Sequence, residues 1–151
     1  MEEFLVSHGL PALLLLSFLA ATLLPLGSEW LLAVLLLKGF APLSTVAVAT
    51  LGNTLGALTT FAIGLWGGPF LTRRLLRIDN AARRRAEHFY ARFGSWSLLL
   101  SWLPVIGDPL CFAGGVLRVD IRRFLLLVAL GKLARYAAVA GMVLAGGKWI
   151  A

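Results

Sequence analysis

The sequence predicts an all-α integral membrane protein: an inverted repeat of two broken, re-entrant helical hairpins, each followed by a transmembrane helix. An interfacial basic amphipathic helix connects the halves. Three observations predict this fold class: the composition, two recurring proline breaks and one arginine-rich segment. Hydrophobic residues make up 60% of the 151 positions and charged residues 14%, against roughly half and a quarter in an average soluble domain. We therefore expect one membrane domain, residues 1–151.

The first half begins with an apolar tract at residues 4–24, which is interrupted at Pro25 and Gly27 and resumes at 29–37. Nine helical residues cover only about 14 Å, whereas a hydrocarbon core is about 30 Å thick. We interpret the two tracts as a re-entrant hairpin. The alternative is that residues 4–24 span the bilayer, which would place the N-terminus on the other side. Residues 42–66 are apolar and long enough to cross.

A basic segment at about 69–93 follows, with apolar positions every three or four residues and arginine on the opposite face. This pattern is typical of an amphipathic helix lying on a membrane surface. It explains much of the net charge of +7 through contact with lipid headgroups, and we expect no nucleic-acid partner. The predicted headgroup contacts are Arg73, Arg74, Arg83, Arg84 and Arg85.

The second half, at about 95–150, has the same organisation as the first, at about 4–66. Apolar residues are interrupted at Pro104 and Gly107, and a long apolar run at 124–150 is predicted to cross the membrane. A basic cluster precedes that run: Arg118, Arg122 and Arg123.

One constant offset of 79 residues relates the halves. Three pairs share it: Pro25 and Pro104, Glu29 and Asp108, and Gly52 and Gly131. Because arginine-rich segments stay in the cytoplasm, we expect the second hairpin to enter from the cytoplasmic side and the first from outside. Their tips would then meet near the midplane, where many transporters bind their substrates.

Four ionisable residues fall in apolar surroundings: Glu29, Asp108, Lys132 and Arg135. Charge inside a membrane is costly and usually marks function. We interpret Glu29 and Asp108 as proton-linked carboxylates, and Lys132 and Arg135 as cations that bind a lipid phosphate. The structural alternative makes Asp108 an N-cap and Glu29 a partner of a helix N-terminus, with the two cations only neutralising the acids.

The sequence contains no motif that predicts an enzyme, a cofactor or a metal site. Serine-elbow, HExxH, CxxC and phosphate-loop patterns are absent from it. Cys111 has no second cysteine with which to form a disulfide. An intramembrane aspartyl protease would need two aspartates, and one of the two acids is Glu29.

Four segments carry a family resemblance: Leu-Pro-Leu-Gly-Ser-Glu at 24–29, Gly-Asn-Thr-Leu-Gly at 52–56, Phe-Tyr-Ala-Arg-Phe-Gly at 89–94 and Ser-Trp-Leu-Pro-Val-Ile-Gly-Asp at 101–108. Together they resemble the DedA family, also called the VTT-domain or SNARE-associated membrane family, and its YqaA-like branch. The resemblance implies paired re-entrant hairpins, a bacterial inner-membrane location, proton coupling and lipid movement, including recycling of undecaprenyl phosphate. In larger relatives two arginines flank the second proline; here the matching positions are Ser101 and Gly107.

We therefore expect a membrane lipid translocase, similar to a flippase or scramblase, that moves undecaprenyl phosphate or another phosphate-bearing lipid between leaflets. It would be a multi-pass protein of the bacterial inner membrane, with lipids and protons as partners. Glycine-rich helix faces also allow a homodimer. The alternatives are a proton-coupled small-ion transporter and a membrane scaffold that transports nothing.

Overall fold

The computed structural model describes residues 2–22, 27–67, 80–103 and 106–150, and within these ranges it is helical with no strand. Pro25, Pro104, Arg73 and Arg74 lie outside the described residues, as does the whole predicted connector before Asn80, and the predicted contact Arg83 lies in a helix but its side chain is outside the described part. The helices are α1 (Glu2–Ala20), α2 (Glu29–Leu37), α3 (Pro42–Trp66), α5 (Asn80–Phe93), the 3₁₀ helix η1 (Gly94–Trp102), α6 (Gly107–Val116) and α7 (Ile121–Ile150).

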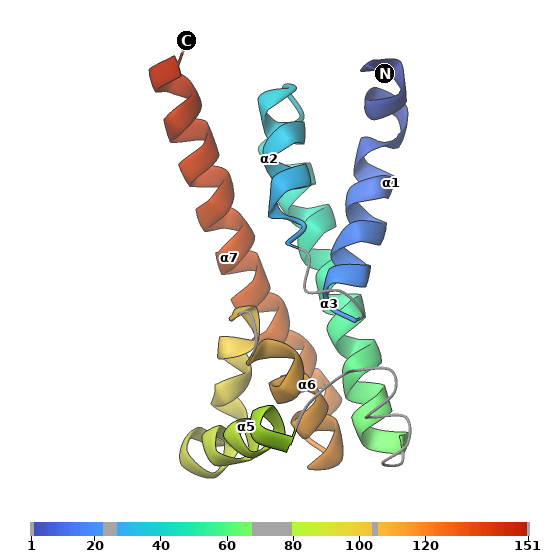
Figure 1. Cartoon of the computed structure of the whole chain (residues 1–151), viewed down its shortest axis with the longest axis vertical. Coiled ribbons are helices and arrows are strands. Elements are labelled where there is room, and N and C mark those ends of the chain that lie inside the picture. The colour runs from blue at the N-terminus through green and yellow to red at the C-terminus, as the bar shows by residue number, and fades with distance from the viewer. Residues whose placement is uncertain (1, 23–26, 68–79, 104–105, 151) are drawn as a thin grey trace.

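Two described helices are long and apolar enough to cross a bilayer: α3 over Pro42–Trp66 and α7 over Ile121–Gly146. They run in opposite directions, α3 downward and α7 upward in Figure 1. The last apolar run, predicted at residues 124–150, lies within α7, which begins three residues earlier at Ile121. The Asp120 carboxylate accepts the backbone N–H groups of Arg122 and Arg123, both at 3.1 Å, and this N-cap starts the helix earlier.

The first hairpin consists of α1 and α2, which run in opposite directions beside the upper half of α3 (Figure 1). The apolar part of α1, His8–Ala20, is shorter than the two candidate spans. α1 packs directly on the α3 backbone, because a Cβ at Gly52 or Gly56 would collide with the carbonyl oxygen of Leu14 or Phe18. Small residues at this spacing allow the two backbones to approach closely.

The second pair, η1 and α6, lies beside the lower halves of α3 and α7 (Figure 1). η1 is a 3₁₀ helix rather than the α-helical continuation of its apolar tract. It begins at Gly94, whose φ of +59° suits glycine, and the Ser97 hydroxyl donates to the Gly94 carbonyl at 2.8 Å. α6 contacts α3 through backbone, because a Cβ at Gly64 or Gly115 would meet a carbonyl of the other helix.

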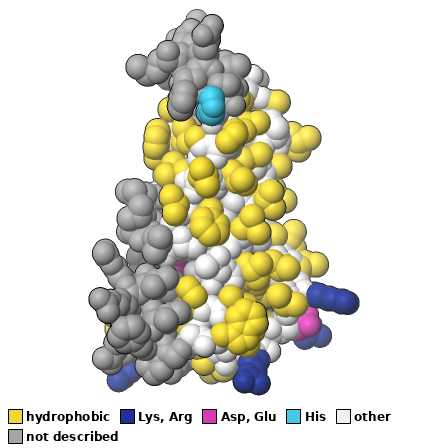
Figure 2. Space-filling model, turned by 90° about the vertical axis from the view of Figure 1, so that its right-hand side faces the viewer, with side chains coloured by type: hydrophobic (Ala, Val, Ile, Leu, Met, Phe, Trp, Pro, Cys, Tyr) yellow, Lys and Arg dark blue, Asp and Glu magenta, His cyan; other side chains and the backbone are white. Residues whose placement is uncertain are grey.

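The amphipathic helix α5 lies across the lower end of the molecule in Figure 1. Arg84 and Arg85 are exposed on it, whereas Tyr90 is buried. We call this end, with α5 and the basic cluster before α7 (Arg118, Arg122 and Arg123), the arginine-rich end. Figure 2 shows Lys and Arg side chains there, below a face rich in hydrophobic side chains. Such a surface suits contact with lipid tails above and headgroups below.

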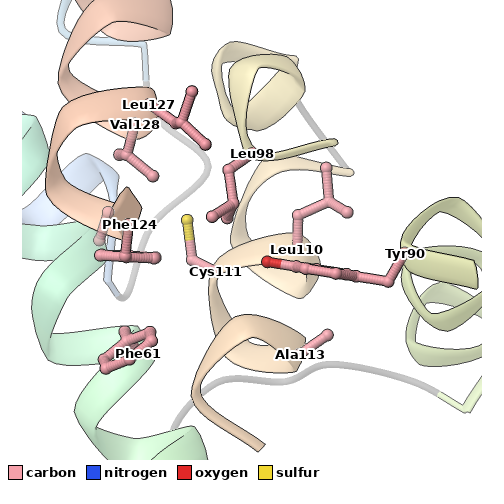
Figure 3. Close-up of a cluster of buried hydrophobic side chains, with 10 residues drawn as sticks. Phe61, Tyr90, Leu98, Leu110, Cys111, Ala113, Phe124, Leu127 and Val128 are labelled. Atoms are coloured by element: carbon pink, nitrogen blue, oxygen red, sulfur yellow. The ribbon is translucent and has the colours of Figure 1, made fainter. Parts of the chain in front are cut away.

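Two apolar clusters fill the interior. The lower cluster joins α3, α5, η1, α6 and α7 (Figure 3), and its ring contact between Phe61 and Phe124 has centroids 4.3 Å apart. The upper cluster joins the first hairpin to α3 and α7 and includes Leu13, Leu32, Ala49 and Tyr136. A set of polar side chains lies between the clusters along α3 and α7.

Candidate functional site

Asn53 of α3 and Lys132 of α7 contact each other near the middle of the two long helices. Each lies eleven residues after the first residue of its helix, roughly 16 Å along the axis at about 1.5 Å per residue. That is about half of a 30 Å hydrocarbon core. Their side chains are 8% and 3% exposed, so this polar pair is buried in the centre of the protein.

The ammonium of Lys132 is held by two oxygens of a single residue. Nζ donates to Oδ1 of Asn53 and to the Asn53 backbone carbonyl, the latter at 3.2 Å. A buried charge needs such partners, because it has lost the solvation that water gives it. Asn53 therefore lets a lysine occupy the interior.

Tyr136 fixes the orientation of the Asn53 amide. Its hydroxyl lies 2.6 Å from the Ser28 hydroxyl and accepts a hydrogen bond from Nδ2 of Asn53 at 3.0 Å. The same Nδ2 donates to the Ser17 carbonyl at 3.1 Å. Because an amide nitrogen is a donor and its oxygen an acceptor, these bonds turn the oxygen of Asn53 toward Lys132.

Arg135 joins the first hairpin to η1. Its guanidinium forms an ion pair with Oε1 of Glu29, and Nη1 donates to the backbone carbonyl of Trp102 at 2.9 Å. The Arg135 and Glu29 side chains are 28% and 23% exposed. The pair is therefore less enclosed than Lys132, so another anion could reach this guanidinium.

Asp108 lies in the first turn of α6, and among the described residues the positive charges that act on its carboxyl are Lys132 and Arg135. The structural alternative that made Asp108 an N-cap does not hold, because the cap residue is Ile106 and Asp108 is inside the helix. Ser28 is the N-cap residue of α2 but makes no side-chain capping bond, because its hydroxyl is used by Tyr136.

The structure therefore pairs Glu29 with Arg135 and places Asp108 where the charges of Lys132 and Arg135 act on it. Three further residues, which were not predicted as site residues, belong to the same region. We call the set the central polar cluster: Ser28, Glu29, Asn53, Asp108, Lys132, Arg135 and Tyr136. One sequence signal could have identified Asn53, since it precedes Lys132 by 79 residues, the offset of the predicted repeat.

Gly107 gives a physical reason for one of the two missing arginines. A Cβ at this position would collide with the backbone carbonyl of Ser101, so the connection between η1 and α6 leaves no room for a side chain there. The cations of the cluster, Lys132 and Arg135, come from α7 instead. Gly27, the other predicted helix-break glycine, is exposed. Nothing within the described residues indicates a metal site made of His, Cys, Asp or Glu.

Comparison with protein families gives a match to the VTT domain over residues 24–144. The chain belongs to the VTT-domain family, known also as the DedA family. It is 40% identical over 134 residues to "Inner membrane protein YqaA" of Escherichia coli K12, covering 88% of this chain and 89% of the relative. A protein of the same name from Shigella flexneri matches equally well.

A third relative, an uncharacterized protein of Haemophilus influenzae, is 36% identical over 146 residues, with 90% of this chain and 88% of the relative covered. No solved structure matches the chain. The VTT-domain match contains every member of the central polar cluster. With two apolar helices of spanning length and relatives named for the inner membrane, the chain is a VTT-domain membrane protein.

Proposed function

We propose that this protein moves a phosphate-bearing lipid, such as undecaprenyl phosphate, between the leaflets of the bacterial inner membrane. The observation that carries the proposal is the position of Arg135, which binds Glu29 of the first hairpin and the backbone of Trp102 in η1. A cation that is shared between two helical hairpins and partly accessible can exchange its carboxylate partner for a phosphate. Guanidinium groups bind phosphate well because their donors match its oxygens.

The proposed architecture is an inverted repeat whose two hairpins re-enter from opposite sides. Support comes from element positions, since α3 begins at Pro42 and α7 begins 79 residues later at Ile121. Asn53 and Lys132, which share this offset, contact each other. Equivalent residues of two repeats touch when they lie next to the pseudo-two-fold axis. The central polar cluster would thus lie at the repeat interface, where transporters bind substrates.

We further propose that protons are coupled to transport through competition for Arg135. While Glu29 is ionised, its carboxylate holds the guanidinium. Protonation of Glu29 removes that charge and frees Arg135 for a phosphate, and the departure of the phosphate lets Glu29 ionise again. The formal charges of Glu29, Asp108, Lys132 and Arg135 sum to zero, so a bound anion and a proton would enter the cluster together.

A direct test is the translocation of labelled polyprenyl phosphate in liposomes, with and without a pH gradient. We expect wild-type protein to move the lipid, and Lys132→Gln and Asp108→Asn to lower the rate at least tenfold. Lys38→Gln and Asp120→Asn are matched controls, because both residues are exposed and asparagine also serves as an N-cap. Retained heat stability of each variant shows that it folds.

Absence of lipid movement in the wild type would contradict the proposal. Flux of a small ion without lipid movement would favour the ion-transporter alternative. If neither is transported and the variants lose only stability, the protein is a scaffold.

A further inference from the structure

A groove of about 520 Å³ opens beside α3 and the connection between α6 and α7. This volume falls within the roughly 300–1,000 Å³ typical of ligand pockets. Its walls are apolar apart from one basic side chain, and the residues used below are Phe61, Ala62, Leu65, Trp66, Ile121 and Arg118. On α3 it lies toward the arginine-rich end from Asn53, so it is separate from the central polar cluster.

Arg118 occupies a backbone position that normally favours glycine. Its φ is +53°, and the turn after α6 is a Schellman motif: Arg118 N–H donates to Gly115 O and Val119 N–H donates to Gly114 O, each at 3.0 Å. A side chain in this left-handed conformation is strained. Backbone strain of this kind is found mainly at residues that bind a ligand or take part in catalysis.

The guanidinium of Arg118 is available to a ligand. The side chain is exposed, and it makes no hydrogen bond or ion pair with any residue that the structure describes. The nearby carboxylate of Asp120 is already used to cap α7. A single cation therefore stands at the mouth of an apolar groove.

We propose that this groove is a binding site for an anionic phospholipid of the surrounding bilayer. An acyl chain would lie against Phe61 and Leu65, with its phosphate on Arg118. The position supports a lipid as the occupant: α3 ends at Trp66, which is 82% exposed, and tryptophan at the end of a spanning helix is typical of the headgroup level. The site is independent of lipid translocation by the central polar cluster.

Trp66 can report on the occupant directly. The full-length protein, with its other four tryptophans changed to phenylalanine, is placed in bilayers containing dibrominated phosphatidylglycerol or dibrominated phosphatidylcholine, whose bromines quench tryptophan fluorescence. We expect phosphatidylglycerol to bind severalfold more tightly than phosphatidylcholine. Arg118→Gln and Arg118→Gly should bring that ratio close to one. Arg118→Gly also removes the backbone strain, so loss of preference cannot be attributed to unfolding.

Two further variants distinguish lipid binding in the groove from general electrostatic attraction of anionic lipids to the basic cluster. Arg122→Gln removes an exposed cation of the same cluster and should leave the preference intact. Ala62→Phe fills the groove and should weaken quenching by both lipids. The proposal is overturned if the two lipids quench equally in the wild type, if Arg118→Gly keeps the preference, if Arg122→Gln removes it equally well, or if Ala62→Phe leaves quenching unchanged.

Discussion

A buried lysine and an asparagine determine the chemistry at the centre of this protein. Lys132 is 3% exposed and depends on the two oxygens of Asn53, while Tyr136 and the Ser17 carbonyl hold the amide in the orientation that presents its oxygen. A hydrogen bond to a charged group contributes about 1.5–3 kcal/mol. The position of the ammonium is thus fixed before any ligand arrives.

We predict that Asn53→Leu lowers the free energy of unfolding by about 2 kcal/mol, because Lys132 is left buried without its amide partner. The double variant Asn53→Leu with Lys132→Met should recover most of the loss, since no charge remains to be satisfied. Thermal unfolding in detergent measures both, with exposed Thr59→Ala on the same helix as the control. Equal losses for the single and double variants would contradict a direct partnership.

Glu29 is predicted to control when Arg135 can bind phosphate. Glu29→Gln removes the competing carboxylate, so polyprenyl phosphate should bind severalfold more tightly and its movement should lose its dependence on a pH gradient. Binding titrations and gradient-driven translocation assays measure these two effects. Asp120→Asn should change neither of them. Weaker binding in Glu29→Gln would mean that the carboxylate positions the guanidinium for the phosphate instead of competing with it.

At the scale of elements, glycine determines how closely the short helices approach the long ones. Gly52 and Gly56 of α3 face carbonyls of α1, Gly64 of α3 faces α6, and Gly131 of α7 faces the Leu99 carbonyl of η1. In a membrane these backbone contacts replace much of the hydrophobic driving force that is available in water. They hold the short helices against the two long ones.

Gly115→Ala is predicted to destabilise the protein by about 1–3 kcal/mol, because the new methyl overpacks against the Phe61 carbonyl. Gly141→Ala makes the same chemical change in open space on α7, where alanine is the better helix former by about 1 kcal/mol. It should be neutral or stabilising. Unfolding by heat in matched detergent compares them, and an equal effect of both variants would contradict the packing assigned to α6.

Much of the helical layout could be predicted from the sequence because it depends on local patterns. The bounds of α2 and α3 follow from apolar runs that end at Leu37 and Trp66. The 3₁₀ form of η1 could not be predicted, because it depends on local hydrogen bonds that carry no hydrophobic signature. Likewise, Glu29, Asp108, Lys132 and Arg135 stand out as charges in apolar tracts. The roles of Asn53 and Tyr136 depend on contacts between distant helices.

On the scale of the whole molecule, polarity is distributed in layers along the long axis. Lys and Arg side chains gather at one end, and hydrophobic side chains cover much of the face above them (Figure 2). The central polar cluster lies between the two apolar clusters. The start of α1 and the end of α2 lie at the opposite end of the molecule from α5 (Figure 1). This distribution fits a membrane domain with its arginine-rich end in the cytoplasm.

Labelling of single cysteines with a membrane-impermeant reagent tests this orientation, in a background where buried Cys111 is changed to alanine. We predict that His8→Cys and Ala41→Cys are labelled from outside and Ala81→Cys from the cytoplasm; all three positions are exposed. Labelling of His8→Cys and Ala41→Cys from opposite sides would mean that the first apolar tract spans the bilayer.

The proposed function requires a lipid phosphate to contact Arg135 and Lys132 inside the membrane domain. Solid-state NMR dephasing between ¹⁵N in lysine and arginine side chains and ³¹P of bound polyprenyl phosphate, in a detergent that contains no phosphorus, detects this contact. We predict dephased signals that disappear in Arg135→Gln and Lys132→Gln. Bound lipid that leaves the nitrogens of both residues without dephasing would contradict a phosphate site at these two cations.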